Sequence, residues 1–250
     1  MKEMKGMRSL VVLVSAWLMC PCWGQEAGPV VPDARSNNLY RTGGGILIPA
    51  KGPVIKIVNC QADVKFPVVA ETAAEIARIT RLPVVAQDMG SKKDARSVIG
   101  RLLSDTNVAA VVIISGVKDE PPMLIAPEAR WAIVNALALK DKDKDSAKQV
   151  SRVRKEIWRA FAYVMGASNS SIEQCVLKPV FSLEDLDNLK PQTICPEPMN
   201  KIMAQAARLG ISPARMTSYR KACEEGWAPA PTNDFQRAVW DEVKGKNNNN

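Results

Sequence analysis

The sequence predicts a single domain of the α/β or α+β class, spanning residues 51–246. In residues 51–166, short apolar and β-branched runs alternate with amphipathic helical segments, and residues 167–246 show helical patterns separated by loops. The chain has 250 residues, of which 46% are hydrophobic and 24% charged, as is ordinary for a globular domain. A mean hydropathy of −0.11 excludes a polytopic membrane protein.

Residues 1–24 have the pattern of a secretory signal peptide. Three basic residues precede the apolar run Leu10–Met19, which is too short to span a membrane. Cleavage after Gly24 is expected because the small residues Cys22 and Gly24 would occupy the −3 and −1 positions. The bulky residues before Cys20 and Cys22 argue against lipoprotein anchoring. We therefore expect an exported protein, periplasmic or secreted, with no transmembrane segment in its mature chain.

The elements that follow are predicted from periodicity. Residues 25–50 are rich in Gly, Pro and polar residues and predict a flexible N-terminal arm. Apolar and β-branched runs predict strands at residues 54–60, 83–87, 108–115, 123–125 and 131–136. Helical spacing predicts helices at residues 67–81, 94–103, 150–165, 199–209, 213–226 and 234–243. The run 108–115 is apolar throughout, which is typical of a strand buried on both faces. Residues 247–250 are expected to be a disordered tail.

Particular residues mark the helix ends. Gly166 closes the long helix 150–165 as a C-terminal cap, and Ser212 followed by Pro213 predicts the start of a helix. Ser182, with Asp185 three residues later, predicts a capping box. An alternative for the acidic cluster around Asp185 is a carboxylate metal site.

The chain contains no histidine. His-dependent metal sites, Ser-His-Asp triads and Cys-His dyads are therefore excluded, and carboxylate, lysine, tyrosine or thiol chemistry remains. The net charge is +8, or +6 once residues 1–24 are removed, and the basic residues are spread along the chain. Segment 140–148 alternates Lys with Asp, and no aromatic-rich basic motif occurs, so nucleic acid is not expected as a partner.

Four cysteines lie outside the signal peptide, namely Cys60, Cys175, Cys195 and Cys223. An even number in an oxidising compartment predicts disulfides, and four cysteines allow three full pairings.

One stretch after the predicted strands has the spacing of a zinc-peptidase motif. The chain reads RAFAYVMGASN from Arg159 to Asn169. Aligned on Gly166, this resembles the H-E-x-x-H-x-x-G-x-x-H helix of the archaemetzincin branch of the metzincins. In that family the three histidines and a water bind the catalytic zinc, and the glutamate is the general base. Here Arg159, Tyr163 and Asn169 occupy the histidine positions, and Ala160 occupies the glutamate position.

The segment after this helix resembles the second zinc motif of the family, C-x4-C-x-M-x17-C-x-x-C. Only Cys175 and Cys195 match it, and two thiolates do not close a tetrahedral zinc site. The resemblance implies that these two cysteines lie close together and form a disulfide in an oxidising compartment. Cys60 and Cys223 are then the residual pair.

The resemblance also implies a metzincin-like three-layer core with a mixed twisted sheet, a long central helix and a helical C-terminal subdomain at 167–246. Residues 131–136 would form the edge strand beside the substrate cleft. An arginine places a permanent cation where zinc would lie, and Ala160 offers no base. We therefore expect no cofactor and no metal, and the substitutions favour a catalytically inactive pseudopeptidase.

Such a protein would bind a peptide or protein in the former substrate cleft, where a peptide could add as a further strand. Arg159, Tyr163 and Asn169 are the candidate ligand-binding residues, suited to an anion or a peptide carboxylate. The simplest alternative is that Arg159 and Tyr163 face solvent on an amphipathic helix, as Glu156 and Lys155 would. Two other functions stay open, an exported hydrolase that uses carboxylates and a generic periplasmic ligand-binding domain.

Overall fold

The computed structural model describes residues 45–61, 63–91, 94–140, 145–190 and 193–247. The predicted signal peptide 1–24, residues 25–44 of the predicted arm and residues 248–250 of the predicted tail lie outside these ranges. Within them, no helix combines the length and the apolar character needed to cross a bilayer.

A five-stranded mixed sheet forms the centre of the fold, with strand order β3-β2-β4-β6-β5. The strands are β2 (Val54–Asn59), β3 (Val84–Asp88), β4 (Val108–Ser115), β5 (Met123–Ala126) and β6 (Trp131–Asn135). The first four in the spatial order run parallel, and β5 pairs antiparallel with β6. All eight residues of β4 are buried, as its apolar run predicts.

The edge strand beside the long helix is β5, so the prediction that residues 131–136 form this edge is wrong. β6 is an inner strand that pairs with β4 on one side and with β5 on the other. The chain turns sharply after Ala126, where Arg130 donates its backbone N–H to the carbonyl oxygen of Pro127. This turn folds β5 back onto β6, and the free edge of the sheet therefore belongs to Met123–Ala126.

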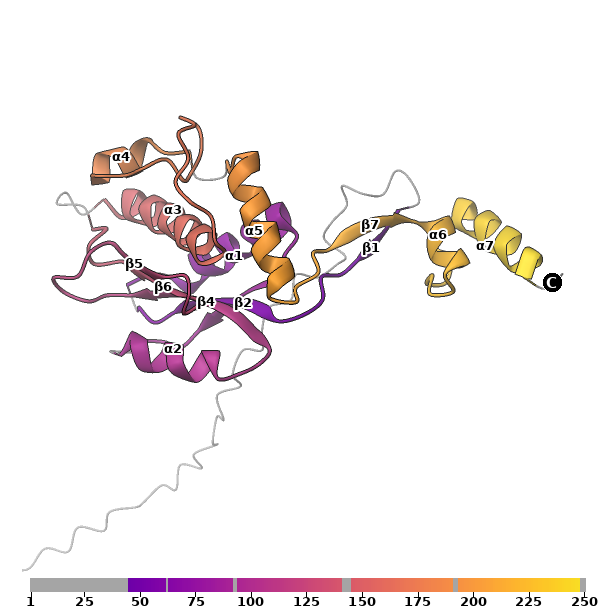
Figure 1. Cartoon of the computed structure of the whole chain (residues 1–250), viewed down its shortest axis with the longest axis horizontal. Helices are drawn as coiled ribbons and strands as arrows, with labels where there is room; N and C mark the ends of the chain where they lie inside the picture. The colour runs from indigo at the N-terminus through magenta and orange to yellow at the C-terminus, as the bar shows by residue number, and fades with distance from the viewer. Residues whose placement is uncertain (1–44, 62, 92–93, 141–144, 191–192, 248–250) are drawn as a thin grey trace, which may run out of the picture.

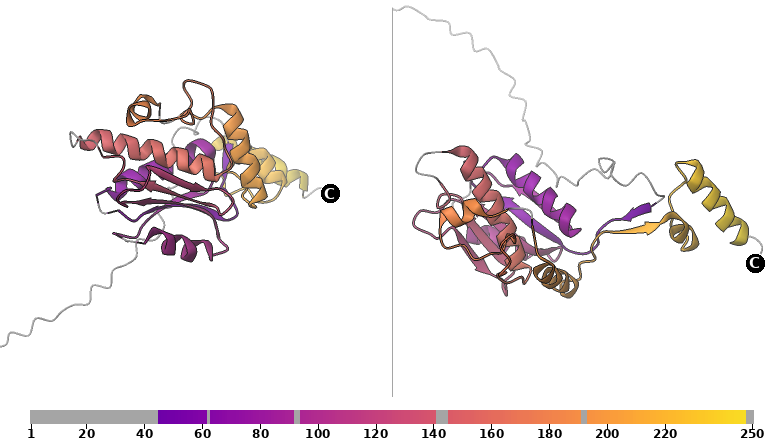
Figure 2. Two further views of the ribbon diagram at one scale, coloured as in Figure 1. Left: turned by 60° about the vertical axis from the view of Figure 1, so that its left-hand side comes forward. Right: turned by 90° about the horizontal axis from the view of Figure 1, so that it is seen from above.

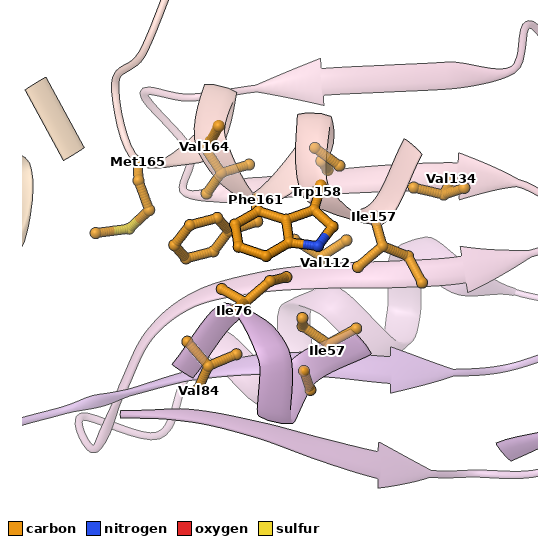
Figure 3. Close-up of a cluster of buried hydrophobic side chains, with 14 of the residues drawn as sticks. Ile57, Ile76, Val84, Val112, Val134, Ile157, Trp158, Phe161, Val164 and Met165 are labelled. Carbon is orange, nitrogen blue, oxygen red and sulfur yellow. The ribbon is translucent and has the colours of Figure 1, made fainter. Parts of the chain in front are cut away.

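Helices cover both faces of the sheet, giving the three layers expected. Helices α1 (Phe66–Thr80) and α3 (Ser146–Val164) lie on one face, and α2 (Ala95–Leu103) lies on the other (Figure 1). The larger core fills the space between the sheet and α3, where Trp158 and Phe161 pack edge to face with ring centroids 6.3 Å apart (Figure 3). One face of α3 is therefore fixed against the sheet, and the residues on its other faces point away from the sheet.

The long helix α3 begins four residues before the predicted start. Asp145 caps it by accepting hydrogen bonds from the backbone N–H groups of the first turn. At the other end Gly166 has a φ of 78°, in the left-handed region that glycine favours. The N–H of Ala167 donates to the carbonyl of Ala162, and that of Gly166 donates to the carbonyl of Tyr163, both at 2.9 Å. This Schellman motif confirms the predicted cap and turns the chain back beside Tyr163.

Four further helices follow, α4 (Leu183–Asn188), α5 (Pro196–Arg208), α6 (Tyr219–Glu224) and α7 (Asp234–Asn247). The capping box predicted from Ser182 and Asp185 is present at the start of α4. Asn247 ends α7, so this residue is not part of a disordered tail, as the sequence suggested.

A second, two-stranded sheet carries the end of the described chain away from the central sheet. Strands β1 (Gly45–Ile48) and β7 (Arg215–Ser218) pair antiparallel, and together with α6 and α7 they form a projection that we call the ribbon module (Figures 1 and 2). Its small core contains Tyr219, Val239 and Val243.

The ribbon module corrects two predictions. Residues 45–48 form a strand instead of a flexible arm, and Ser212–Pro213 does not start a helix. Ser212 exchanges two backbone hydrogen bonds with Lys51, with N···O distances of 3.0 and 2.8 Å, and the next residues pair with β1. The helix-start signal at Ser212–Pro213 is overridden by strand pairing between segments that are distant in the sequence. The C-terminal subdomain is therefore not wholly helical.

Candidate functional site

A pocket of about 940 Å³ lies beside the C-terminal half of α3, between this helix, the edge strand β5 and residues 179–183. Its apolar lining consists of Pro122, Met123, Ile125, Ala138, Pro179, Val180, Phe181, Leu183 and Leu186. Its polar lining consists of Glu156, Arg159, Tyr163, Ser168, Asn169 and Ser182. Apolar walls with a few convergent polar groups are typical of ligand sites.

The three residues at the histidine positions of the motif all line this pocket. Tyr163 lies one helical turn after Arg159, whose guanidinium carbon is 5.6 Å from the centre of the Tyr163 ring. The turn at Gly166 brings Asn169 back, so that the Tyr163 hydroxyl donates to Asn169 Oδ1 at 2.6 Å. Ala160, at the position of the catalytic glutamate, is fully buried in the hydrophobic core.

Arg159 is buried, so its alternative assignment to a solvent-facing helix surface is wrong. Its side chain is 8% exposed. Nη1 donates to the carbonyl oxygens of Val176 at 2.9 Å and Lys178 at 2.7 Å. Nε is buried, lies 3.2 Å from Glu156 Oε1 and has no hydrogen-bond partner, and both guanidinium hydrogen bonds found within the described part of the chain come from Nη1, which leaves Nη2 available. A guanidinium has five N–H donors, so part of the hydrogen-bonding capacity of this buried cation is unused.

Glu156 is the pocket residue that the sequence did not reveal, since its neighbours favour a solvated face. Its side chain is 5% exposed. Burial raises the pKa of Glu156 to about 7, although the nearby Arg159 cation acts in the opposite direction. Burial also raises the pKa of Tyr163. Spacing was the available signal, because Glu156, Arg159 and Tyr163 recur at i, i+3 and i+7 on one helix face.

The N-terminal half of α3 buries two further basic side chains, and both have strong partners. Arg152 binds the Asp187 carboxylate of α4 through Nε and Nη2, each at 2.7 Å, and it donates to the carbonyl of Leu139 at 3.3 Å. Lys155 Nζ donates to the carbonyls of Leu186 at 2.9 Å and Asp187 at 2.7 Å. The Arg152 hydrogen bond lowers the pKa of Asp187, and burial lowers the pKa of Lys155. These contacts fasten α4, and with it one wall of the pocket, to α3.

The two cysteines of the motif lie next to the segment that holds Arg159. Cys175 and Cys195 are buried free thiols whose side chains are hydrogen-bonded to each other, and Ser170 contacts both. Burial raises the pKa of Cys195, and its hydrogen bond with Cys175 acts in the same direction. Burial also acts to raise the pKa of Cys175, but hydrogen bonds from the backbone N–H groups of Leu177 and Cys195 outweigh it and lower that pKa.

The other two cysteines, Cys60 and Cys223, belong to two different hydrophobic clusters. Cys60 packs in the hydrophobic cluster around α2, whereas Cys223 packs in the ribbon module. The structure therefore brings Cys175 and Cys195 together and places Cys60 and Cys223 in separate clusters, and both disulfide pairings stay predictions. In the described ranges, no group of three or more Cys, Asp or Glu side chains is arranged to hold a metal ion.

No protein-family model matches the sequence, and no curated protein matches it. Solved structures similar to this chain include archaemetzincin from Methanopyrus kandleri, with 14% identity, a TM-score of 0.48, and coverage of 63% of this chain and 97% of that one. They also include a zinc-dependent peptidase from Methanocorpusculum labreanum, with 14% identity, a TM-score of 0.47, and coverage of 59% and 99%. A third is archaemetzincin from Archaeoglobus fulgidus complexed with malonate, with 19% identity, a TM-score of 0.42, and coverage of 59% and 99%. At these identities the likeness concerns the fold alone.

Proposed function

We propose that this chain is an exported, non-catalytic binding protein whose pocket beside α3 takes an extended peptide as a further strand on β5. The observation that carries the proposal is the composition of one pocket. It joins a free strand edge to apolar walls, and its polar floor has Arg159, Tyr163 and Asn169 where the resembling family has zinc ligands. The proposal of export rests on the pattern of residues 1–24.

A peptide suits the pocket because β5 is an edge strand. An edge strand leaves a row of backbone N–H and C=O groups unpaired, which an extended peptide can pair with. Met123 and Ile125 lie two residues apart on β5, and both side chains line the pocket. On the opposite wall, Phe181 is 92% exposed, so a large apolar surface is available to ligand side chains.

Binding without catalysis is proposed because the pocket lacks an arranged base. The histidine-free sequence supplies no imidazole, and Ala160 lies in the core. Glu156 is the carboxylate in the pocket, but it lies beside the Arg159 guanidinium, with which it forms a buried ion pair. A general base must reach the proton that it removes, and a carboxylate held against a cation is poorly suited to activate water.

The test combines a binding assay with a hydrolysis assay on the purified protein. A random-sequence octapeptide library is expected to yield binders by affinity selection, without cleavage of casein or of those binders. Ile125→Lys places a charge on the apolar wall and is expected to weaken binding at least tenfold. Ile172→Lys is the matched control, because Ile172 is 50% exposed and does not line the pocket.

Two results would contradict the proposal. The first is no peptide binding at all. The second is peptide cleavage that survives chelation and disappears in Glu156→Gln. This result would favour the alternative function, a hydrolase that uses carboxylates.

A further inference from the structure

Several polar groups around the pocket floor present hydrogen-bond donors to a ligand, and the oxygens of Asn169 and Ser168 already accept from protein donors. Asn169 Oδ1 accepts from Tyr163, which leaves the two N–H donors of Asn169 Nδ2. Ser168 Oγ accepts from Lys201 Nζ at 2.7 Å, which leaves its O–H as a donor. Arg159 Nη2 adds a charged donor with no protein acceptor in the described residues. A set of donors around a cation selects a ligand with acceptor oxygens and a negative charge.

The cation in this set belongs to a buried and incompletely satisfied side chain. Arg159 is more than nine-tenths buried, and its Nε has no aligned hydrogen bond. Two backbone carbonyls hold Nη1 and so fix the guanidinium in place. The donors are therefore oriented before a ligand arrives, which lowers the entropy lost on binding.

Glu156 is the group that would compete with an incoming anion for Arg159. The titratable side chains that line the pocket are Glu156, Arg159 and Tyr163, all from α3, and the lining residues of β5 and of residues 179–183 carry none. In α4, Asp185 accepts from the backbone N–H groups of Phe181 and Ser182, and Asp187 binds Arg152. A second carboxylate can approach the guanidinium without repulsion once Glu156 is neutral, and its pKa of about 7 allows this near neutral pH.

We propose that the pocket binds a carboxylate group of a peptide through Arg159 Nη2 and Asn169 Nδ2, while Glu156 takes up a proton from solvent. This inference rests on the proposed peptide-binding function and specifies its ligand chemistry. The carboxylate has two sources, the C-terminus of the peptide or an Asp or Glu side chain, and the test separates them.

The experiment compares the random octapeptide library in two forms, with a free C-terminal carboxylate and with a C-terminal amide, at pH 6 and pH 8. The acid form is expected to bind at least tenfold more tightly than the amide form at pH 6. Because Glu156 must be protonated, the affinity is expected to fall about tenfold from pH 6 to pH 8. Glu156→Gln is expected to remove this pH dependence and to keep the preference for the acid form.

Variants of the donors separate recognition from folding. Arg159→Met is expected to abolish the preference for the acid form, and Arg154→Met on the same helix is the control, because Arg154 does not line the pocket. Asn169→Asp tests the same donor set at an exposed position, where folding is not at risk. It keeps an acceptor for Tyr163 but replaces Nδ2 by a repelling oxygen, and a loss of at least tenfold for acid peptides alone is expected.

Each outcome decides a separate point. Equal binding of acid and amide libraries, with binders that lack Asp and Glu, would leave the proposed function standing and overturn the carboxylate inference. Amide binders that all contain Asp or Glu would support the same chemistry with the side chain as its source. A preference for the acid form that does not change with pH would overturn the role of Glu156. An absence of binding by either library would overturn both the inference and the proposed function.

Discussion

The two halves of helix α3 bury charge in different ways. In the N-terminal half, Arg152 has a two-point contact with Asp187, and Lys155 donates to two carbonyls. In the C-terminal half, Arg159 has two carbonyl partners at Nη1 and a poorly aligned carboxylate at Glu156, and among the described residues its Nε has no hydrogen-bond partner. Both groups of buried charges lie on one helix, and they differ in how many of their hydrogen-bond donors have a protein acceptor.

This difference separates a structural charge from a candidate binding charge. A buried ion with all of its partners holds two elements together, and removing one partner is costly because a charge is left unpaired. A buried ion with unused donors at a pocket wall retains capacity for a ligand. Burial does not distinguish the two halves of α3, because the charged side chains of both are buried. Comparing the donors of each basic side chain with its protein acceptors does distinguish them.

The largest expected effect comes from breaking the N-terminal half. Arg152→Met removes both hydrogen bonds to Asp187 and is expected to lower the free energy of unfolding by about 3–4 kcal/mol. This is the lower part of the range for a buried pair, because the Asp187 side chain is 28% exposed. Urea unfolding measures the change. Arg159→Met is the matched variant and is expected to cost less, and the reverse order would refute the comparison.

The next effect concerns the segment that supports the C-terminal half. We expect Cys175 and Cys195 to form a disulfide in oxidising buffer, which closes a loop of about 20 residues and stabilises the fold by roughly 3 kcal/mol. Alkylation followed by mass spectrometry detects the bond, and melting with and without reductant measures its effect. Cys60→Ser should retain the reductant shift, and Cys175→Ser should lose it. Thiols that stay fully alkylatable after treatment with oxidised glutathione would rule out the disulfide.

A smaller effect with a distinct sign comes from Glu156. Its pKa is about 7 in the folded state and about 4.5 without burial, so the folded state holds a proton that the unfolded state has lost between these pH values. The contribution of Glu156 to stability is therefore fully present below pH 4.5 and is lost as the pH rises through 7. The loss amounts to about 3 kcal/mol.

The pH dependence is tested by comparing the unfolding of Glu156→Gln with that of the unchanged protein at pH 5 and pH 8. The variant is expected to be the more stable protein at pH 8 and similar at pH 5. A variant that is less stable at pH 8 would mean that the Glu156–Arg159 ion pair outweighs the cost of burial, which would make the two halves of α3 alike.

The smallest effect concerns the link between Tyr163 and Asn169. Tyr163→Phe removes one hydrogen bond, and a loss of about 0.5–1 kcal/mol in stability is expected. Because Asn169 then loses the group that orients its amide, the affinity for acid peptides is expected to fall a few-fold, as measured by calorimetry. Unchanged affinity would remove Asn169 from the donor set.

Local signals predicted the part of the site that depends on one helix and its end. The spacing predicts that Arg159 and Tyr163 share one helix face, and Gly166 predicts the cap, whereas Asn169 was grouped with them by the resemblance to the zinc motif. The capping box at Ser182 was equally readable, because all of its contacts lie within four residues.

The rest depended on distant segments. The sequence placed Lys155 and Glu156 on a solvated face, because their burial depends on where α4 and residues 176–178 pack. The edge position of β5 depends on its antiparallel pairing with β6, which strand propensity does not encode. Strands β1 and β7 were missed because they pair with each other although the residues of the whole central domain lie between them in the sequence.

The pairing of β1 with β7 also determines the order in which parts of the protein can fold during synthesis. A ribosome makes chain at ≈5–20 residues per second, so Gly45–Ile48 emerges on the order of ten seconds before the strand that completes its ladder. During that interval the segments of the central sheet and of α3 are all synthesised. The pocket can therefore assemble while the ribbon is still open. A nascent chain that stops before Ser218 would contain every residue of the pocket and no complete ribbon, so the ribbon can close only after the whole pocket has been synthesised.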